Sequence, residues 1–295
     1  MLDTLFEELL ALNSRFEEAG VSIILGGGMG LYLRDQFLGG QRSPRYPVRP
    51  ESRSTEDLDM LLNADVIVDA EKMNALRDVL DEMGYEDETK HFQFVRTLEI
   101  ARQKRTVRVD LLAAPPADAD REKVKIKRPR VRPHASEQIH GFLTDEAAGI
   151  DIGKVPIDLS SDVDADQGDA AGSLVYIPSS FNYLILKLNA FHDRRDRTDD
   201  ESDQGRHHAF DIFRIVTDMR EDDWQTAEKH VALDGNADYV KNAATLQRRH
   251  FSDDTSEGII RLKENEGYRR RRDEFDGYID DFLDDLRELF AEVDA

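Results

Sequence analysis

A short apolar stretch that leads directly into glycines constrains the fold of this chain more than any other feature. Residues 21–25 are typical of a short buried strand, residues 26–28 are glycines, and residues 31–38 carry apolar side chains at helical spacing. This order of elements forms a cradle for phosphate groups, because glycine allows close approach of the backbone and a helix N-terminus presents unpaired N–H groups. We therefore predict a phosphate-binding turn at Gly27 and Gly28.

A second apolar stretch carries two carboxylates. Residues 57–62 read Asp-Leu-Asp-Met-Leu-Leu and are predicted to form a strand, in which Asp57 and Asp59 share one face. Two neighbouring carboxylates repel each other unless a cation lies between them. Their oxygens suit Mg²⁺, which proteins commonly hold by one or two carboxylates and substrate phosphates. Together with the glycine turn, this strand indicates metal-assisted phosphoryl or nucleotidyl transfer.

A third acidic residue lies in a later strand. Residues 92–96 and 106–112 alternate between apolar and polar side chains, so we expect a hairpin or two neighbours in one mixed sheet. Asp110 lies within the second of these stretches, where a half-buried strand is expected. It is either an acid at a solvated strand edge or a third oxygen donor for the metal. We prefer the metal, because Asp57 and Asp59 alone leave it short of ligands.

Composition restricts the class of protein. With 39% hydrophobic residues and 14 phenylalanines, the 295 residues can bury a sizeable core. The absence of cysteine excludes disulfides, thiolate zinc sites and cysteine nucleophiles. The apolar run near the N-terminus is too short to span a bilayer and residues 1–18 are unlike a signal peptide, so we expect a cytoplasmic protein with no membrane partner. The net charge of −22, mostly from aspartate, is typical of adaptation to a salt-rich cytoplasm.

Two polar stretches interrupt this pattern. Residues 121–134 form the only strongly basic run of the sequence, which is either a solvated strand or loop, or a contact for nucleotide phosphates or an RNA backbone. Residues 39–54 are rich in glycine, proline and arginine and separate the glycine turn from the carboxylate strand. We interpret them as a surface insertion in preference to a flap that contacts substrate.

The second half of the chain is predicted to be helical. Ser179 or Ser180 is a suitable N-cap for a helix over residues 181–192, which contains Lys187 among apolar residues. Such a lysine either extends to the surface or serves chemistry. A further helix over 206–216 carries Asp211 in its apolar half, and the remaining residues are also typical of helices. We expect two domains, residues 1–177 and residues 178–295.

Taken in order, these motifs resemble the nucleotidyltransferase core, a minimal version of the polymerase-β fold. The resemblance rests on Gly-Gly after a strand, Asp57-x-Asp59 on the next strand and a single Asp110 on a later one. The second half, with Leu-Lys-Leu-Asn-Ala-Phe at 186–191, Asp-Arg at 193–194 and Arg206 ahead of Asp211, resembles the AbiEii type, found as toxins of toxin–antitoxin pairs. This implies an α+β fold, with a mixed sheet flanked by helices and a mainly helical C-terminal region.

The resemblance also implies roles for individual residues of these motifs. Gly27 and Gly28 would hold the triphosphate of an NTP, and Lys187 and Arg194 would contact the same nucleotide. Asp57, Asp59 and Asp110 would ligate two Mg²⁺ ions. Asp110 would also help to position the attacking hydroxyl. Asp211 would orient Lys187 or a neighbouring arginine. The implied reaction transfers a nucleoside monophosphate to an acceptor hydroxyl and releases pyrophosphate.

Three alternatives remain open for the acceptor and for the presence of catalysis. The first is an RNA end, such as that of a tRNA, or a protein, modified by a toxin-like enzyme with a cognate antitoxin protein. The second is a small molecule, as in antibiotic-modifying nucleotidyltransferases, and the third is a binding protein that has lost the chemistry. The chain also departs from the family pattern: a serine or threonine after the glycines is missing, residues 39–54 are inserted, and His208 replaces an acid.

Overall fold

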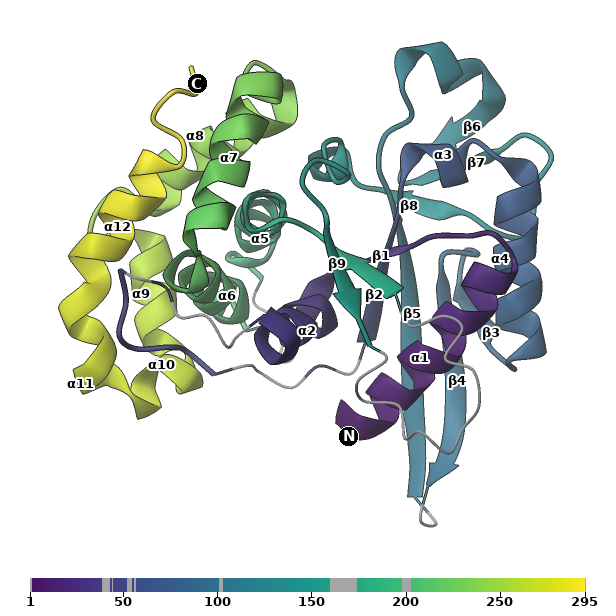
Figure 1. Ribbon diagram of the computed structural model, residues 1–295, viewed down its shortest axis with the longest axis horizontal. Coiled ribbons are helices and arrows are strands. Elements are labelled where there is room, and N and C mark those ends of the chain that lie inside the picture. The colour runs from purple at the N-terminus through teal and green to yellow at the C-terminus, as the bar shows by residue number, and fades with distance from the viewer. Residues whose placement is uncertain are drawn as a thin grey trace. The chain divides into compact units, whose positions relative to one another are not determined.

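The computed structural model describes residues 2–38, 43, 45–51, 55, 57–100, 103–159, 174–197 and 203–294 (Figure 1). The chain divides into two compact units, which are treated separately below. The first comprises Met1–Phe37 and Ser54–Pro178, and the second comprises Leu38–Arg53 and Ser179–Ala295. The division at Pro178 lies next to the boundary expected from the sequence, whereas the segment Leu38–Arg53 groups with the helical unit.

The first unit is built on a mixed sheet in the order β6-β7-β8-β5-β2-β1-β10-β9, with β4 pairing both β5 and β3. Its strands are β1 (Ile24–Leu25), β2 (Asp57–Leu62), β3 (Glu86–Thr89), β4 (Gln93–Ile100), β5 (Gln103–Ala113), β6 (Val124–Lys127), β7 (Arg130–Pro133), β8 (Gly141–Leu143), β9 (Val155–Asp158) and β10 (Leu174–Ile177). β2 and β5 are parallel neighbours at its centre, and β4 and β5 form an antiparallel hairpin, the first of the two arrangements expected from the sequence.

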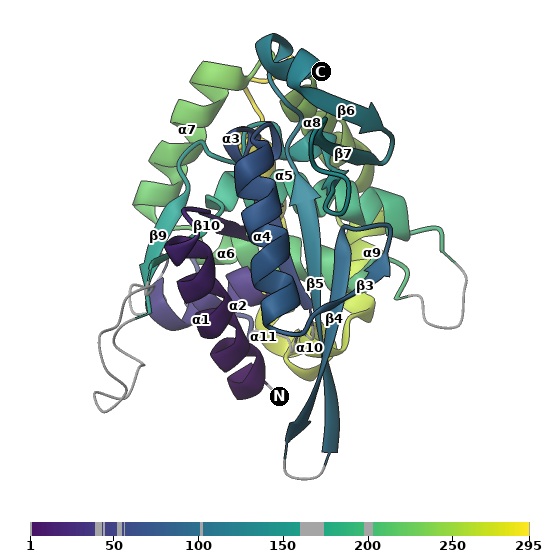
Figure 2. The same cartoon turned by 90° about the vertical axis from the view of Figure 1, so that its right-hand side faces the viewer.

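The helices of this unit are α1 (Leu2–Glu18), α2 (Gly27–Leu38), α3 (Ala64–Ile67) and α4 (Ala70–Glu82), with short 3₁₀ turns at Asp118–Lys123 and Asp145–Ala147. The spacing of apolar residues predicts one helix over residues 65–83, but the structure has two helices here. Asp69 separates them, because its side chain accepts hydrogen bonds from the backbone N–H groups of Glu71 and Lys72 and caps α4. α1 and α4 lie side by side over the sheet (Figure 2).

The two faces of the sheet differ in chemistry. The Arg77 guanidinium of α4 lies 5.1 Å from the ring centroid of Phe94, which pairs with Val109 of β5, so α4 covers this face. The side chains of β2 and β5 on the face that α4 covers are fully buried; they are Leu58, Met60, Val109 and Leu111. Because side chains alternate along a strand, the aspartates of both strands project from the opposite face.

The second unit consists of helices. They are α5 (Ser180–Arg194), α6 (Arg206–Asp218), α7 (Glu221–Asp234), α8 (Asp238–His250), α9 (Glu257–Glu264), α10 (Glu266–Arg270), α11 (Arg272–Phe275) and α12 (Ile279–Glu288), with a 3₁₀ turn at Asp276–Tyr278. α5 packs against α6, α7 and α8, and α6 also contacts α9 and α12. Of the two serines predicted as caps, Ser179 caps α5 by accepting a hydrogen bond from the Asn182 N–H. Across the described residues, no helix is both long and apolar enough to cross a membrane.

The described part of the expected surface insertion is anchored on these helices. The Arg45 guanidinium lies 4.1 Å from the ring centroid of Trp224 on α7 and pairs with Asp285 of α12. Four residues later, the Nε atom of Arg49 is 3.1 Å from the carboxylate of Asp218 at the end of α6. Residues 45–49 are therefore held by charges and an aromatic ring at positions that the sequence pattern did not single out.

Candidate functional site

The glycine turn is also the first turn of α2. The sequence predicted a helix from residue 31, but α2 begins at Gly27, which has a φ of +58°. A Cβ atom on Gly27 would lie 1.7 Å from the Asp59 Oδ2 atom, so no larger residue fits here. The Asp59 carboxylate therefore lies against the N-terminal end of α2, where backbone N–H groups and the helix dipole favour negative charge.

A hydroxyl group lies beside the turn, although none follows the glycines in the sequence. A Cβ atom on Gly28 would be 2.9 Å from the Thr55 Oγ1 atom, and Thr55 is buried. Thr55 precedes β2 and reaches the turn only because β1 and β2 are neighbours. The missing serine or threonine of the family pattern thus has a spatial substitute, which no local sequence signal could have indicated.

Two aspartates are brought together by the register of the sheet. Asp59 on β2 is the direct neighbour of Asp110 on β5, and Gln93 on β4 faces Asp110 from the other side. Burial, together with the charges of Asp59 and Asp57, raises the pKa of Asp110 to about 6, although a hydrogen bond from Gln93 acts in the opposite direction. Among the described atoms, the buried Oδ1 atom of Asp110 has no hydrogen-bond partner. This combination is expected where a cation completes a carboxylate pair.

Asp57 is placed differently from the other two aspartates. Its direct neighbour on β5 is Arg108, whose guanidinium lies 3.5 Å from the Asp57 carboxylate and also pairs with Glu88. Within the described ranges, no three histidine, cysteine, aspartate or glutamate side chains form a group that could hold a metal ion. The set that fits Mg²⁺ is therefore the pair Asp59 and Asp110 with phosphate oxygens of a bound nucleotide, since this ion takes few protein ligands.

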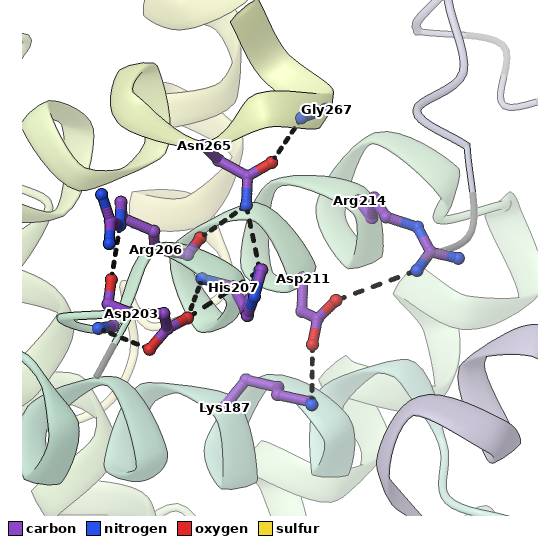
Figure 3. A network of polar contacts seen from close by, with 9 residues as sticks. Lys187, Asp203, Arg206, His207, Asp211, Arg214, Asn265 and Gly267 are labelled. Carbon is purple, nitrogen blue, oxygen red and sulfur yellow. Dashed lines mark hydrogen bonds and ion pairs between the residues drawn. The ribbon is translucent and has the colours of Figure 1, made fainter. Parts of the chain in front are cut away.

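In the second unit, Lys187 and Asp211 form a buried ion pair. The Lys187 Nζ atom donates to the Asp211 Oδ2 atom at 2.8 Å, and the two side chains are 8% and 0% exposed. Arg214, one helical turn beyond Asp211, places its guanidinium 3.8 Å from the Asp211 Oδ1 atom (Figure 3). The i, i+3 spacing of Asp211 and Arg214 is a signal that the sequence analysis could have used.

His208 and Arg194 lie near this ion pair. Burial lowers the pKa of His208 to about 3, and the charges of Lys187 and Arg194 act in the same direction. The imidazole is therefore neutral at physiological pH where the family pattern often has an acid. Arg194 is the last residue of α5, and its side chain is exposed.

The start of α6 is held by a separate polar network. The carboxylate of Asp203 accepts hydrogen bonds from the backbone N–H groups of Gly205 and His207, and Asn265 of the α9–α10 junction donates to the Arg206 carbonyl (Figure 3). These contacts fix the first turn of α6. This is the helix that carries Asp211.

The expected site residues therefore fall into groups. In the first unit, Gly27, Gly28, Asp59 and Asp110 converge, with Asp57 on the adjacent position of the same sheet face. In the second unit, Lys187 and Asp211 are bonded to each other. The residues that the sequence analysis missed are Thr55, Gln93, Arg108 and Arg214, of which Gln93 and Arg108 follow from the strand register alone.

No family model matches the chain, and neither a curated protein nor a solved structure was found to match it. The structure itself defines the class as α+β, with a mixed sheet flanked by helices and a helical C-terminal region. The nucleotidyltransferase resemblance remains an interpretation of the motifs.

The substitution Asp110→Asn is expected to stabilise the protein when no divalent cation is present. Because the pKa of the Asp110 carboxyl is raised to about 6, the folded state between about pH 4 and pH 6 holds a proton that the unfolded state has already lost. Asp110 therefore lowers the free energy of unfolding as pH rises through 6, and this loss is absent below the unfolded pKa near 4. We expect Asp110→Asn to gain roughly 1–2 kcal/mol at pH 7.5 and almost nothing at pH 4 in urea unfolding.

The matched control is Asp57→Asn. Its carboxylate is 43% exposed and lies beside Arg108, so removal of its charge should change the free energy of unfolding by less than about 0.5 kcal/mol. Equal gains at pH 7.5 and pH 4 for Asp110→Asn would show that ionisation of the Asp110 carboxyl is not the cause.

Proposed function

We propose that this protein is a Mg²⁺-dependent nucleotidyltransferase that moves a nucleoside monophosphate from an NTP to an acceptor hydroxyl. One observation carries the proposal: the Asp59 carboxylate lies against the glycine N-terminus of α2, and the direct neighbour of Asp59 in the sheet is Asp110. A phosphate group bound to that helix start would meet Asp59 as a second anion. A divalent cation between them removes the repulsion, which is how nucleotide phosphates are usually held beside carboxylates.

Each group at this site has a role in the proposed reaction. The N–H groups at Gly27 and Gly28 and the hydroxyl of Thr55 would donate hydrogen bonds to triphosphate oxygens. Asp59 and Asp110 would hold Mg²⁺, whose chemistry is to neutralise charge on the phosphates during displacement. The acceptor oxygen forms a bond to the α-phosphorus, and the bond from that phosphorus to the bridging oxygen breaks. Pyrophosphate leaves, and the hydroxyl proton passes to Asp110 or to water.

The second unit enters the proposal through its motifs. The resemblance assigns Lys187 and Arg194 to the nucleotide and Asp211 to the orientation of Lys187, which is supported by the 2.8 Å contact between these two side chains. The same resemblance supports a toxin-like activity controlled by an antitoxin protein. A neighbouring reading frame that encodes a small DNA-binding protein would agree with this part.

One observation favours a second candidate, a nucleotide-binding protein without catalysis. Asp57, assigned as a metal ligand by the resemblance, lies beside Arg108, and a guanidinium at this position competes with a cation. In this alternative, nucleotide binding persists but no transfer occurs.

Incubation with each of the four α-labelled NTPs, Mg²⁺ and mixtures of RNA, protein or aminoglycosides tests the proposal. Potassium chloride should be varied up to molar concentration because of the acidic composition. We expect label to transfer to one acceptor class, with Mg²⁺-dependent NTP binding by calorimetry. Binding without transfer in any mixture would favour the second candidate, and absence of both would overturn the assignment of the site.

A further inference from the structure

The basic run forms a hairpin that presents like charges opposite one another. β6 and β7 pair Lys125 with Arg132 and Lys127 with Arg130. Directly opposite residues of an antiparallel pair project from the same face, so these four cations share one face of the hairpin. Like charges in directly opposite positions destabilise a strand pair, and the arrangement therefore requires negative charge from elsewhere.

The protein supplies little of that negative charge. Arg121, Lys123 and Arg128 pair with Asp118, Asp120 and Asp145. In contrast, no ion pair with a described acid is found for Lys125, Lys127 or Arg130. Arg132 donates to backbone carbonyls, and its nearest acid is Glu137 at 4.0 Å, which is 82% exposed. Within the described residues, these cations are therefore not neutralised by nearby acids, although the chain as a whole has a net charge of −22.

The same four side chains line a concave pocket of about 320 Å³, together with His91, Glu137 and His140. His140 is only 6% exposed, and its Nδ1 atom lies 3.0 Å from the Lys90 carbonyl oxygen. Its Nε2 atom is buried and has no hydrogen-bond partner among the described atoms. Because the Nδ1–H group donates to that carbonyl, Nε2 of the neutral ring is an acceptor, so the donors that the pocket offers to a ligand are those of the four cations.

The pocket and the aspartates occupy the same face of the first unit's sheet. On β5, Leu112 shares a face with Asp110, and its direct neighbour on β8 is Phe142. Phe142 in turn pairs with Arg130 on β7. β7 is two strands from β5, or about 10 Å at the usual strand spacing. The aromatic ring of Phe142, with 37% exposure, lies along this path.

We propose that the hairpin pocket binds backbone phosphates of a nucleic-acid strand, whose terminal hydroxyl is the acceptor at Asp59 and Asp110. Several cations in a row match successive phosphates, and an exposed aromatic ring offers a stacking surface for a base. A small-molecule acceptor has no use for this surface. Phosphate binding by the pocket does not depend on the proposed nucleotidyl transfer, whereas the role as acceptor site does.

Fluorescence anisotropy with labelled single-stranded RNA and DNA of the same sequence tests the binding. The test variant is Lys125→Gln/Lys127→Gln/Arg130→Gln, and the matched control is Arg121→Gln/Lys123→Gln/Arg128→Gln, which removes the same charge from cations that are already paired. We expect the test variant to lose about tenfold or more in affinity, and the slope of log K against log salt to fall by about 2. The control should change affinity by less than a factor of about three.

The outcomes separate the two proposals. Equal losses of affinity in both variants, or no binding of RNA or DNA by the unaltered protein, would overturn the proposal that the pocket binds phosphates. Equal binding of RNA and DNA would identify the shared backbone as the ligand, and preference for RNA would identify RNA as the source. If binding is lost in the test variant but the unaltered protein never transfers nucleotide, only the proposed function fails. If transfer to a nucleic acid occurs and is unchanged in the test variant, the acceptor role of the pocket is wrong.

Discussion

The variant Asp59→Asn is expected to transfer nucleotide about 10³-fold more slowly than the unaltered protein. Its side chain keeps nearly the same volume, so the close approach to Gly27 is retained. What is lost is one of two adjacent negative charges that would hold the cation against the triphosphate. Removal of a single preorganised electrostatic partner of the reacting phosphates reduces rates by roughly this factor. Initial rates in the labelled-NTP assay measure the effect.

The control for Asp59→Asn is Asp78→Asn, which makes the same change on an exposed position of α4. It should leave the transfer rate unchanged. Urea unfolding shows whether Asp59→Asn has kept the fold, since loss of its contact with the helix start is worth only about 0.3–1 kcal/mol. A rate within a few-fold of the unaltered protein in a folded variant would remove Asp59 from the site.

Lys187→Met is expected to destabilise the protein by about 3–5 kcal/mol. The substitution keeps the apolar stem but removes the ammonium group that lies 2.8 Å from the Asp211 carboxylate. The fully buried carboxylate then loses its nearest cation and keeps the Arg214 guanidinium at 3.8 Å, and removal of one partner of a buried ion pair is costly. The free energy of unfolding from urea titrations at pH 7.5 is the measurement.

The double variant Lys187→Met/Asp211→Leu separates structure from chemistry. Replacement of both partners by apolar residues should recover part of the lost free energy of unfolding, because the buried carboxylate is gone, although Arg214 also loses its contact with Asp211. If Lys187 contacts the nucleotide as the resemblance implies, this folded double variant remains inactive in the labelled-NTP assay. An active double variant would restrict the pair to a structural role that joins α5 to α6.

The sequence by itself determined the local elements and the residue types available for chemistry. Alternation over residues 57–62 and 106–112 predicted strands with their aspartates on one face, because the period of a strand is a property of the backbone alone. Likewise, Ser179 predicted the start of α5, since a cap depends on neighbours in the chain. The capping side chain of Asp69, by the same logic, is readable from the sequence but was outweighed by the longer apolar pattern.

Only the tertiary structure decided which of these residues meet. Strand register placed Asp110 beside Asp59 and gave Asp57 an arginine neighbour. A shift by one residue would have given these aspartates apolar neighbours instead. The same register aligned the basic hairpin with the aspartate face and brought Thr55 to the glycine turn. Register depends on the packing of many distant side chains at once, so a single local pattern does not contain it.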